Sequence, residues 1–382
     1  MLNRRTLLAA GALPWASLAL AAGPATSERR LVLLILRGGL DGLQAVPAPG
    51  DPAFAEARGV LGRFDSEPLP LAGPFALHPQ LPQLHAMYRR QELLVLHAIG
   101  LPYHERSHFD AQQVLESGGQ RPHERDDGWL GRALAVTGGG AIGLSTAVPL
   151  ALRGAAQVDT WAPSALPDPS PDLLARLERL YAGDPALGAA LGRARTLQAE
   201  PGMAGMAGAV AGVGAAQGLA TRAAEFLSRP GGPGTAVLEL GGWDSHANQA
   251  APQGALTQNL KRVDAMLAAL HSGLGPRWAQ TVVLVVTEFG RQVAVNGTQG
   301  TDHGSGGVAL LAGGAVRGGR VLADWPGLAP KDRFEGRDLR STTDLRALLH
   351  GVLHEHLQVP RAALDRTVLP GVAAPLRDIV RA

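Results

Sequence analysis

Residues 281–319 read TVVLVVTEFGRQVAVNGTQGTDHGSGGVALLAGGAVRGG, and this stretch determines the fold class that we expect. Its opening VVLVV is an unbroken aliphatic run, which is typical of a strand buried on both faces of a parallel sheet. The run ends just before Glu288, so a carboxylate lies at the end of a central strand, where open α/β sheets bind ligands. A polar loop with Asp302 and His303 leads into a second apolar run at 308–312. We expect the two strand ends to bring these three side chains to one crevice as metal ligands.

Two earlier apolar runs end in the same way, in glycines followed by a carboxylate. Residues 31–36 lead into Asp41, and residues 235–240 lead into Asp244, with His246 two positions later. Side chains two apart lie on the same side of an extended segment, so Asp244 and His246 can reach one ion. Asp41 could instead belong to a turn or cap a helix, and Asp244 could cap the helix that follows it. The recurrence of the pattern favours metal ligands at both places.

A further buried strand is expected at 93–99, and a histidine-rich turn follows it. Ser107 falls near the start of the next helix, where free backbone N–H groups favour an anion. A serine there can attack a phosphoryl or sulfuryl centre, but Ser107 with Asp110 three residues later also resembles an ordinary capping arrangement. His104 and His108 lie within the same five residues and favour a catalytic role for this turn.

The composition excludes several classes of protein. Removal of Arg4 and Arg5 with a signal segment leaves 33 of the 35 basic residues against 33 acidic ones, so the mature chain is about neutral. We therefore expect no basic face for nucleic acid. The chain has no cysteine, which excludes disulfides, thiolate ligands and a cysteine nucleophile. At 382 residues and 46% hydrophobic content it can bury a substantial core.

Residues 1–22 are typical of a targeting segment. Arg4 and Arg5 precede a modest apolar stretch and a small-x-small cleavage signal. The paired arginines predict that the twin-arginine export machinery carries the folded protein to the periplasm, and cleavage would leave no stable membrane span. An uncleaved anchor helix is the alternative.

Runs with strand character alternate with helical spacing along the rest of the chain. We expect residues 23–382 to form a single α/β domain with a mostly parallel sheet and helices on both faces. Another strand, or the start of one, is predicted at 144–152. Residues 165–228 combine a proline-rich start, helical spacing and a glycine-alanine segment, which predicts a helical insertion or cap.

The order of short motifs along the chain resembles that of one bacterial protein family. That family is exported with a twin-arginine signal, is known only as a domain of unknown function, and is remotely related to alkaline phosphatases and sulfatases. The resemblance covers nearly all of the mature chain and implies an alkaline phosphatase-like fold. The motifs are Gly-Gly-Leu-Asp-Gly, Arg-Ser-His-Phe-Asp-Ala-Gln, Gly-Gly-Trp-Asp-Ser-His-Ala-Asn-Gln, Thr-Glu-Phe-Gly-Arg, Thr-Asp-His-Gly and Arg-Ser-Thr-Thr-Asp-Leu-Arg.

The resemblance to phosphatases carries over residue by residue. Asp41 resembles the acid that bridges toward a second metal and the nucleophile, and Ser107 stands where the nucleophile would. Asp244 resembles the first ligand of the other metal, and His303 resembles the late histidine that completes that centre. Glu288 occupies the place of a further acidic ligand.

Two positions depart from the pattern of the related enzymes. Phe289 stands where they have a histidine ligand, and Asn248 stands where a partner histidine is common, with His246 close by. One centre from Asp244, His246 and His303 is expected, whereas a second centre would contain only carboxylates. The resemblance thus implies one or two divalent ions: Zn²⁺ at the histidine-bearing centre, or Mn²⁺, Mg²⁺ or Ca²⁺ at oxygen-rich sites. A degenerate site without an ion is the alternative.

Two functions of different classes are consistent with these features. The first is a periplasmic metal-dependent hydrolase of phosphate or sulfate esters, in which Ser107 attacks a small-molecule ester and His246 or His104 protonates the leaving group. The second is an exported binding or assembly protein that keeps the fold without the chemistry and has another exported protein as its partner.

Overall fold

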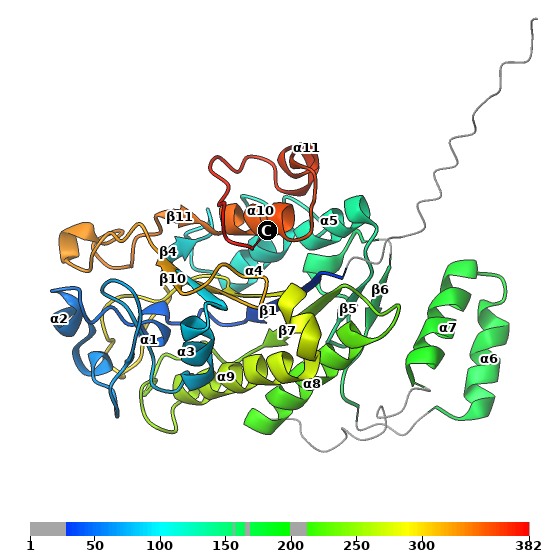
Figure 1. The fold of residues 1–382 in the computed structure, drawn as a ribbon, viewed down its shortest axis with the longest axis horizontal. Helices are drawn as coiled ribbons and strands as arrows, with labels where there is room; N and C mark the ends of the chain where they lie inside the picture. Colours follow the sequence, from blue (N-terminus) through cyan, green and yellow to red (C-terminus); the bar gives the residue numbers. More distant parts are fainter. Residues whose placement is uncertain (1–27, 156, 165–168, 199–211, 382) are drawn as a thin grey trace, which may run out of the picture.

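The structure is a computed structural model, and Figure 1 shows the path of its chain. It describes residues 28–155, 157–164, 169–198 and 212–381. The predicted export signal, residues 1–22, lies outside the described residues.

A nine-stranded sheet forms the centre of the molecule. Eight strands follow one another in the order β10-β4-β9-β8-β1-β7-β5-β6, and β11 pairs with β4. A separate hairpin pairs β2 (Leu69–Pro70) with β3 (Ala76–Leu77). The strands of the main sheet are β1 (Arg30–Leu36), β4 (Leu93–Gly100), β5 (Ala141–Gly143), β6 (Val158–Thr160), β7 (Thr235–Leu240), β8 (Thr281–Thr287), β9 (Gly307–Ala312), β10 (Arg320–Leu322) and β11 (Thr343–Asp344).

All neighbouring strands of this sheet are parallel except those beside β9. β1 lies between β7 and β8 and is parallel to both, whereas β9 is antiparallel to β8 and to β4. Every residue of β1, β4, β8 and β9 is buried, as the unbroken apolar runs predict. The predicted class, a mostly parallel α/β sheet, is confirmed.

Two hydrophobic cores cover the two faces of the sheet. In β1, Val32 and Leu34 pack into one core while Leu31 and Leu33 pack into the other, because successive strand side chains point to opposite faces. Figure 1 shows α4, α5 and α10 on one face and α3, α8 and α9 on the other. The helices are α1 (Gly42–Ala45), α2 (Phe54–Arg58), α3 (Pro82–Arg89), α4 (His108–Ser117), α5 (Trp129–Thr137), α6 (Pro171–Tyr181), α7 (Pro185–Gln198), α8 (Val213–Ser228), α9 (Ala255–Leu274), α10 (Leu345–Glu355) and α11 (Arg361–Ala363).

In the segment 165–228, predicted as a helical insertion, the described residues form the helices α6, α7 and α8. α6 has no buried residue, whereas α8 buries Ala220, Phe226 and Leu227 in the same core as α9. α8 therefore belongs to a layer that covers the sheet and not to an insertion. The strand predicted at 144–152 is wrong, because the strand here ends at Gly143 and a 3₁₀ helix follows Pro149, whose ring removes a backbone donor.

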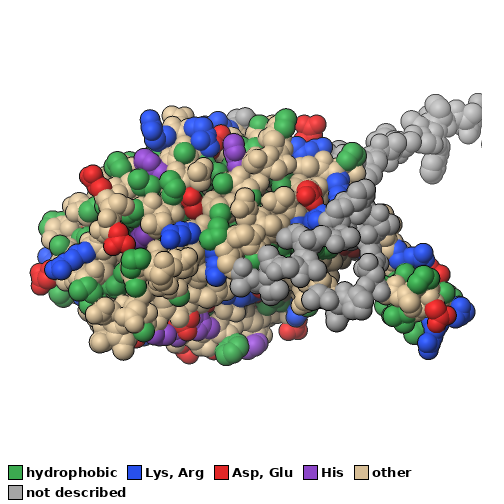
Figure 2. All heavy atoms as spheres, turned by 90° about the horizontal axis from the view of Figure 1, so that it is seen from below, with side chains coloured by type: hydrophobic (Ala, Val, Ile, Leu, Met, Phe, Trp, Pro, Cys, Tyr) green, Lys and Arg blue, Asp and Glu red, His purple; other side chains and the backbone are tan. Residues whose placement is uncertain are grey.

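Figure 2 shows no large patch of one charge sign on this face of the molecule. Lysine and arginine side chains are interspersed with aspartate and glutamate over that face. Within the described ranges, none of the helices combines the length and the apolar character that a bilayer crossing requires.

The topology brings several polar loops to one edge of the sheet. β1, β7 and β8 are parallel, so their carboxyl ends lie together. Because β9 is antiparallel to β8 and β4, its amino end lies at the same edge as the carboxyl end of β4. The loops that leave or enter these ends are 37–41, 101–107, 241–254 and 288–306.

Candidate metal centre

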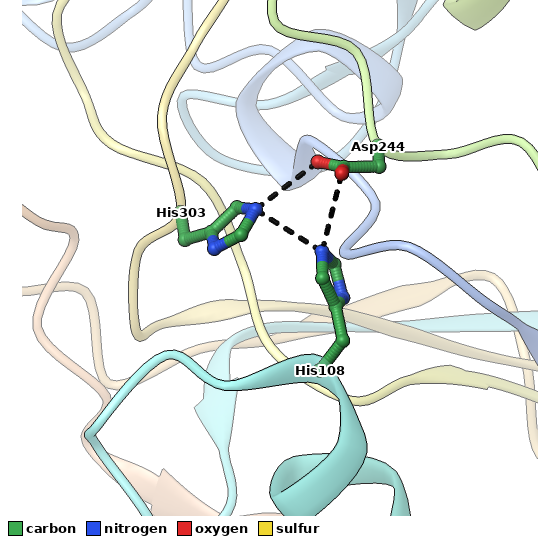
Figure 3. A group of neighbouring side chains, drawn as sticks. All are labelled: His108, Asp244 and His303. Atoms are coloured by element: carbon green, nitrogen blue, oxygen red, sulfur yellow. Dashed lines mark hydrogen bonds and ion pairs between the residues drawn. The ribbon is translucent and has the colours of Figure 1, made fainter.

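Three side chains from separate parts of the chain meet at this edge. His108 is the first residue of α4, Asp244 lies in the loop after β7, and His303 lies in the loop before β9. Figure 3 shows these side chains pointing toward one another. Each offers a ligand atom, and these atoms all lie within 4.8 Å of one another. The described part of the chain thus contains a cluster of histidine and aspartate that could hold a metal ion.

His246 adds a third imidazole, and we call His108, Asp244, His246 and His303 the histidine cluster. Nε2 of His303 is 3.1 Å from Nε2 of His108 and 3.2 Å from Nε2 of His246. Asp244 Oδ1 is 2.9 Å from His246 Nε2 and 3.1 Å from His303 Nε2, while Oδ2 is 3.4 Å from His108 Nε2. Ligand atoms that are neighbours around a tetrahedral Zn²⁺, with bonds of about 2.0–2.1 Å, lie roughly 3.3 Å apart. The atoms of His108, Asp244 and His303 could therefore approach one ion, and His246 contacts this group through His303 and Asp244.

Each imidazole of the histidine cluster uses Nδ1 in a hydrogen bond to an oxygen acceptor. The pairs are His108 with Glu288 (2.8 Å), His246 with Asp302 (3.3 Å) and His303 with the backbone carbonyl of Arg106 (3.0 Å). Carboxylates and carbonyls accept and do not donate, so each Nδ1 is placed to donate its proton, and each Nε2 faces the cluster, where the carboxylate of Asp244 lies. Hydrogen bonds of this kind fix the tautomer of metal-binding histidines.

The Nε2 atoms of the cluster face one another and the carboxylate of Asp244. The pKa of His108 is raised, chiefly by its hydrogen bond to Glu288, so a proton could bridge His108 and His303. Burial lowers the pKa of His303, which favours its neutral ring. A metal cation could bind Nε2 of a neutral ring together with the carboxylate of Asp244.

The histidine cluster is open to solvent on one side. The side chains of Asp244 and His246 are 43% and 46% exposed, and that of His108 is 22% exposed. Burial alone would raise the pKa of Asp244, but hydrogen bonds from Arg291 and His303 outweigh it and lower the pKa, which keeps the carboxylate ionised. A centre with an open position is typical of catalytic ions, because structural ions are enclosed by protein ligands.

Glu288 supports His108 from inside the protein. Its Oε1 accepts hydrogen bonds from the N–H of Gly38 (2.7 Å) and from Nε2 of Gln112 (3.0 Å) as well as from His108. Burial alone would raise the pKa of Glu288, but the hydrogen bonds from His108 and Gln112 outweigh it and lower the pKa. This buried carboxylate is therefore placed to orient a ligand, which differs from the expectation that it binds the ion itself.

Asp302 contacts His246 as Glu288 contacts His108, through Nδ1 of the ring. Its Oδ1 accepts hydrogen bonds from Asn296 (3.2 Å) and from His246 (3.3 Å), and the bond from Asn296 is the main reason for its lowered pKa. Asp302 points to the Nδ1 side of the ring and not to the Nε2 side, where the other ligand atoms gather. It too is placed to orient a histidine, and its predicted role as a ligand stays a prediction.

Asp41 lies outside the histidine cluster. Its carboxylate accepts hydrogen bonds from Arg58 (2.5 Å) and Gln249 (2.6 Å) and caps α1 by accepting from the N–H of Gln44 (3.2 Å). The side chain is buried, so these partners occupy it fully. In this structure Asp41 forms a buried ion pair and a helix cap apart from the histidine cluster, and the second, carboxylate-only centre stays a prediction.

The glycines before Asp41 have a steric role at the same edge. A Cβ on Gly38 would lie 2.5 Å from the backbone nitrogen of Asp244, and Gly38 has φ +123°, which side chains rarely adopt. A Cβ on Gly39 would lie 2.6 Å from the ring of Phe289. The glycine motif therefore allows the loops that carry the histidine cluster to approach each other.

Ser107 and His104 occupy different surroundings. Ser107 is the N-cap of α4, and its Oγ accepts a long hydrogen bond from the N–H of Asp110 (3.5 Å). It lies directly between Arg106, whose carbonyl holds His303, and His108 in the sequence. His104 is exposed and packs on the ring of Phe334 at a centroid distance of 5.2 Å, outside the histidine cluster.

Sequence reasoning assigned His108 to catalysis, whereas the structure places it among the candidate ligands. Sequence reasoning missed the residues that form hydrogen bonds to the candidate ligands on the side away from the cluster. No sequence motif marks such a role. Only their position next to histidine and aspartate motifs could have pointed to them. These residues are Arg106, Gln112, Arg291 and Asn296.

Comparison with known proteins identifies the family and gives distant structural likenesses. The model of the family described as "Protein of unknown function (DUF1501)" matches residues 96–379. Comparison with curated proteins gives no match. A phosphonate monoester hydrolase of Agrobacterium radiobacter is 13% identical, with 87% of this chain and 74% of that chain covered and a TM-score of 0.38. A sulfatase from Pseudoalteromonas sp. is 14% identical, with 77% and 64% covered and a TM-score of 0.38.

A third solved structure is the zinc complex of the C-terminal periplasmic domain of EptC from Escherichia coli. It is 9% identical, with 75% of this chain and 73% of that chain covered and a TM-score of 0.34. Sequence identity is below 15% in all three comparisons, so the role of a single residue cannot be transferred from them.

Proposed function

The chain belongs to the DUF1501 family of proteins of unknown function, and from its histidine cluster we propose that it is a metal-dependent hydrolase of phosphate or sulfate esters. One observation carries this proposal: the Nε2 atoms of three histidines and one ionised carboxylate converge at a solvent-exposed point, with every Nδ1 already bonded to an acceptor. Three imidazoles and a carboxylate favour Zn²⁺ over Mg²⁺ or Ca²⁺, which prefer oxygen ligands.

The start of α4 supports an anionic substrate. A bound ion would polarise an ester oxygen and lower the pKa of a hydroxyl or water beside it. The N–H groups of His108 and Phe109 lie in the first turn of α4, where a helix leaves its donors without intrahelical partners and favours negative charge. Ser107 caps this turn, where its Oγ accepts a long hydrogen bond from the N–H of Asp110, and it is the candidate nucleophile.

The proposal includes export to the periplasm by the twin-arginine route. Its motivation is the sequence of residues 1–22, with Arg4 and Arg5 before a short apolar stretch. Replacement of both arginines by lysine in the full-length chain should retain the protein in the cytoplasmic fraction, while the unchanged chain should appear in the periplasmic fraction in a shorter form. Equal periplasmic amounts of both forms would contradict this route.

The hydrolase is tested with purified mature protein, stripped of metal and then supplied with Zn²⁺, Mn²⁺, Mg²⁺ or Ca²⁺. We expect release of phosphate or sulfate from nitrophenyl esters only with an added ion, and loss of this activity in His303→Ala. Ser107→Asn is the informative nucleophile variant, because asparagine caps a helix as well as serine but lacks the hydroxyl. Ser170→Ala, at the N-cap of α6, is the matched control for loss of a capping serine.

Each outcome separates one part of the proposal from the others. Loss of activity in Ser107→Asn supports a serine nucleophile, whereas unchanged activity there together with loss in His303→Ala would leave a metal-activated water as the attacking group. A protein that binds the ion tightly but hydrolyses none of the esters would overturn the hydrolase and favour the exported binding or assembly protein.

A further inference from the structure

The segment at the end of β8, Thr287-Glu288-Phe289-Gly290-Arg291, touches the histidine cluster at several points from its buried side. Glu288 reaches His108, as described above. The ring of Phe289 lies 4.7 Å from that of His108 and 5.1 Å from that of His303 between centroids. Phe289 is only 5% exposed, so one buried aromatic ring packs against two imidazoles.

Arg291 completes the segment with a buried positive charge. Its side chain is fully buried, and Nη1 donates to Asp244 Oδ1 at 2.8 Å. Nε and Nη2 of Arg291 have no hydrogen-bond partner among the described residues. Asp244 is therefore the counter-charge of this guanidinium, and rotation of Asp244 toward solvent would leave a buried cation unpaired.

The backbone of Arg291 is also tied to the loop that carries another ligand. Arg291 forms an antiparallel bridge with His303, and the N–H of Gly304 donates to the carbonyl of Gly290 (2.9 Å). The side chain and the backbone of one residue thus locate two members of the histidine cluster, Asp244 and His303.

Resting on the proposed function, we propose that Arg291 is a positioning residue that locks Asp244 in its ligand orientation, so that the site is formed before an ion binds. The ionic pair holds the carboxylate by Oδ1 and keeps it ionised. Phe289 restrains the ring planes of His108 and His303 in the same way, by packing. A preformed site loses less conformational freedom when it binds, which raises its affinity.

The test is the Zn²⁺ affinity of purified mature protein, measured by competition with a chromogenic chelator. We expect Arg291→Met to weaken binding by 10- to 100-fold, the usual effect of losing a residue that orients a metal ligand. Arg291→Lys keeps the charge but not the planar fork, and we expect an intermediate affinity. The visible absorption of bound Co²⁺ should also change in Arg291→Met, because Asp244 is no longer held in one orientation.

Arg132→Met is the matched control. Arg132 is another buried arginine that pairs with an aspartate, Asp127 (2.6 Å), but it lies on α5 and contacts no member of the histidine cluster. We expect it to lower stability and to leave Zn²⁺ affinity and the Co²⁺ spectrum unchanged. Circular dichroism with a chelator present shows whether each variant is folded. If Arg291→Met is not folded, Arg291→Lys is used to measure the effect on Zn²⁺ affinity.

Two further results would separate the inference from the proposed function. Zn²⁺ binding by Arg291→Met within twofold of the unchanged protein, with the same Co²⁺ spectrum, would overturn the positioning role while leaving the hydrolase proposal intact. Failure of the unchanged protein to bind Zn²⁺ or Co²⁺ at all would overturn both.

Discussion

At the scale of single residues, the histidine cluster depends on groups that form hydrogen bonds to the candidate ligands on the side away from the cluster. Glu288 holds His108, and the Arg106 carbonyl holds His303, each through the Nδ1 proton. These partners decide which ring nitrogen is free, and so they decide whether the histidines can bind a metal at all.

Glu288→Gln tests this dependence at one carboxylate. Glutamine is nearly the same shape and can still accept from the N–H of Gly38, so the fold should persist, but the charge that supports His108 is lost. We expect Zn²⁺ affinity to fall by about 10- to 100-fold. Glu355→Gln is the control. Glu355 accepts hydrogen bonds from three backbone N–H groups near the carboxyl terminus, those of Asp378, Ile379 and Val380, so this variant should leave Zn²⁺ affinity unchanged. Equal Zn²⁺ affinity in both variants would contradict the role of Glu288.

A second residue-level prediction concerns pH and the buried His97. Its Nδ1 accepts from the N–H of Ala98 (2.8 Å) and its Nε2 donates to the carbonyl of Val46 (3.0 Å), so the neutral ring fits the site. Burial lowers the pKa of His97 from 6.5 to about 4. Between these values the unfolded chain binds a proton that the folded chain does not, so stability is full above pH 6.5 and falls as the pH drops toward 4.

The size of this effect follows from the shift in pKa. One pKa unit is equivalent to about 1.4 kcal/mol, so His97 should remove up to about 3 kcal/mol of the unfolding free energy by pH 4. Urea unfolding with a chelator present, between pH 7 and pH 4, measures the slope, and His97→Gln should make it shallower by up to one proton. An unchanged slope in His97→Gln would show that other groups, such as the buried His78 and His356, account for it.

At the scale of elements, long-range contacts supply what local sequence does not. α3 begins at Pro82 after Leu81, which has no side-chain cap, and Asp264 of α9 accepts from the N–H groups of Gln83 and Leu84 instead. The cap of one helix thus comes from another helix that is far away in the sequence. This contact joins α3 to α9 on the same face of the sheet.

Asp264→Ala should therefore lower the stability of the whole domain by about 1–2 kcal/mol, the usual loss for a helix cap. Asp264→Asn keeps an acceptor oxygen and should cost less. Urea unfolding followed by circular dichroism measures the difference. Asp344→Ala, which removes an aspartate that caps α10 locally by accepting from the N–H of Arg346, shows what an ordinary cap contributes in the same protein. A loss below about 0.5 kcal/mol in Asp264→Ala would argue against the interhelical cap.

At the scale of the whole molecule, the candidate ligands come from the start of α4 and from two loops that only folding brings together. His108, Asp244, His246 and His303 span nearly 200 positions of sequence and meet because the central strands present their ends at one edge. An ion that binds them all binds the folded chain in preference to the unfolded one, and so it must stabilise the fold.

Zn²⁺ should accordingly raise the thermal midpoint of the mature protein, and excess chelator should reverse the rise. At a free Zn²⁺ concentration 100 times the Kd, the gain is about 2.7 kcal/mol. His303→Ala should show little of it, and Arg132→Met should show the full gain from a lower starting midpoint. A midpoint that is independent of Zn²⁺ in the unchanged protein would refute the metal centre.

The sequence alone determined the sheet and the region of the site. The valine- and leucine-rich runs at β1 and β8 predict fully buried parallel strands, because only strands covered on both faces lack polar positions. Glycines followed by an acid or a histidine at strand ends mark the ligand-binding edge. His246, Asp244 and His303 were predicted as candidate ligands for these reasons.

Only the tertiary structure shows which partner each of these carboxylates has. Asp41, Asp244 and Glu288 follow similar strands, yet Asp41 is taken up by Arg58, Glu288 is buried behind His108, and only Asp244 faces the other ligand atoms. Local sequence cannot reveal these differences, because the partner of each carboxylate comes from a distant part of the chain. The partner and the burial decide whether a carboxylate faces a metal site, orients a histidine or forms a structural ion pair.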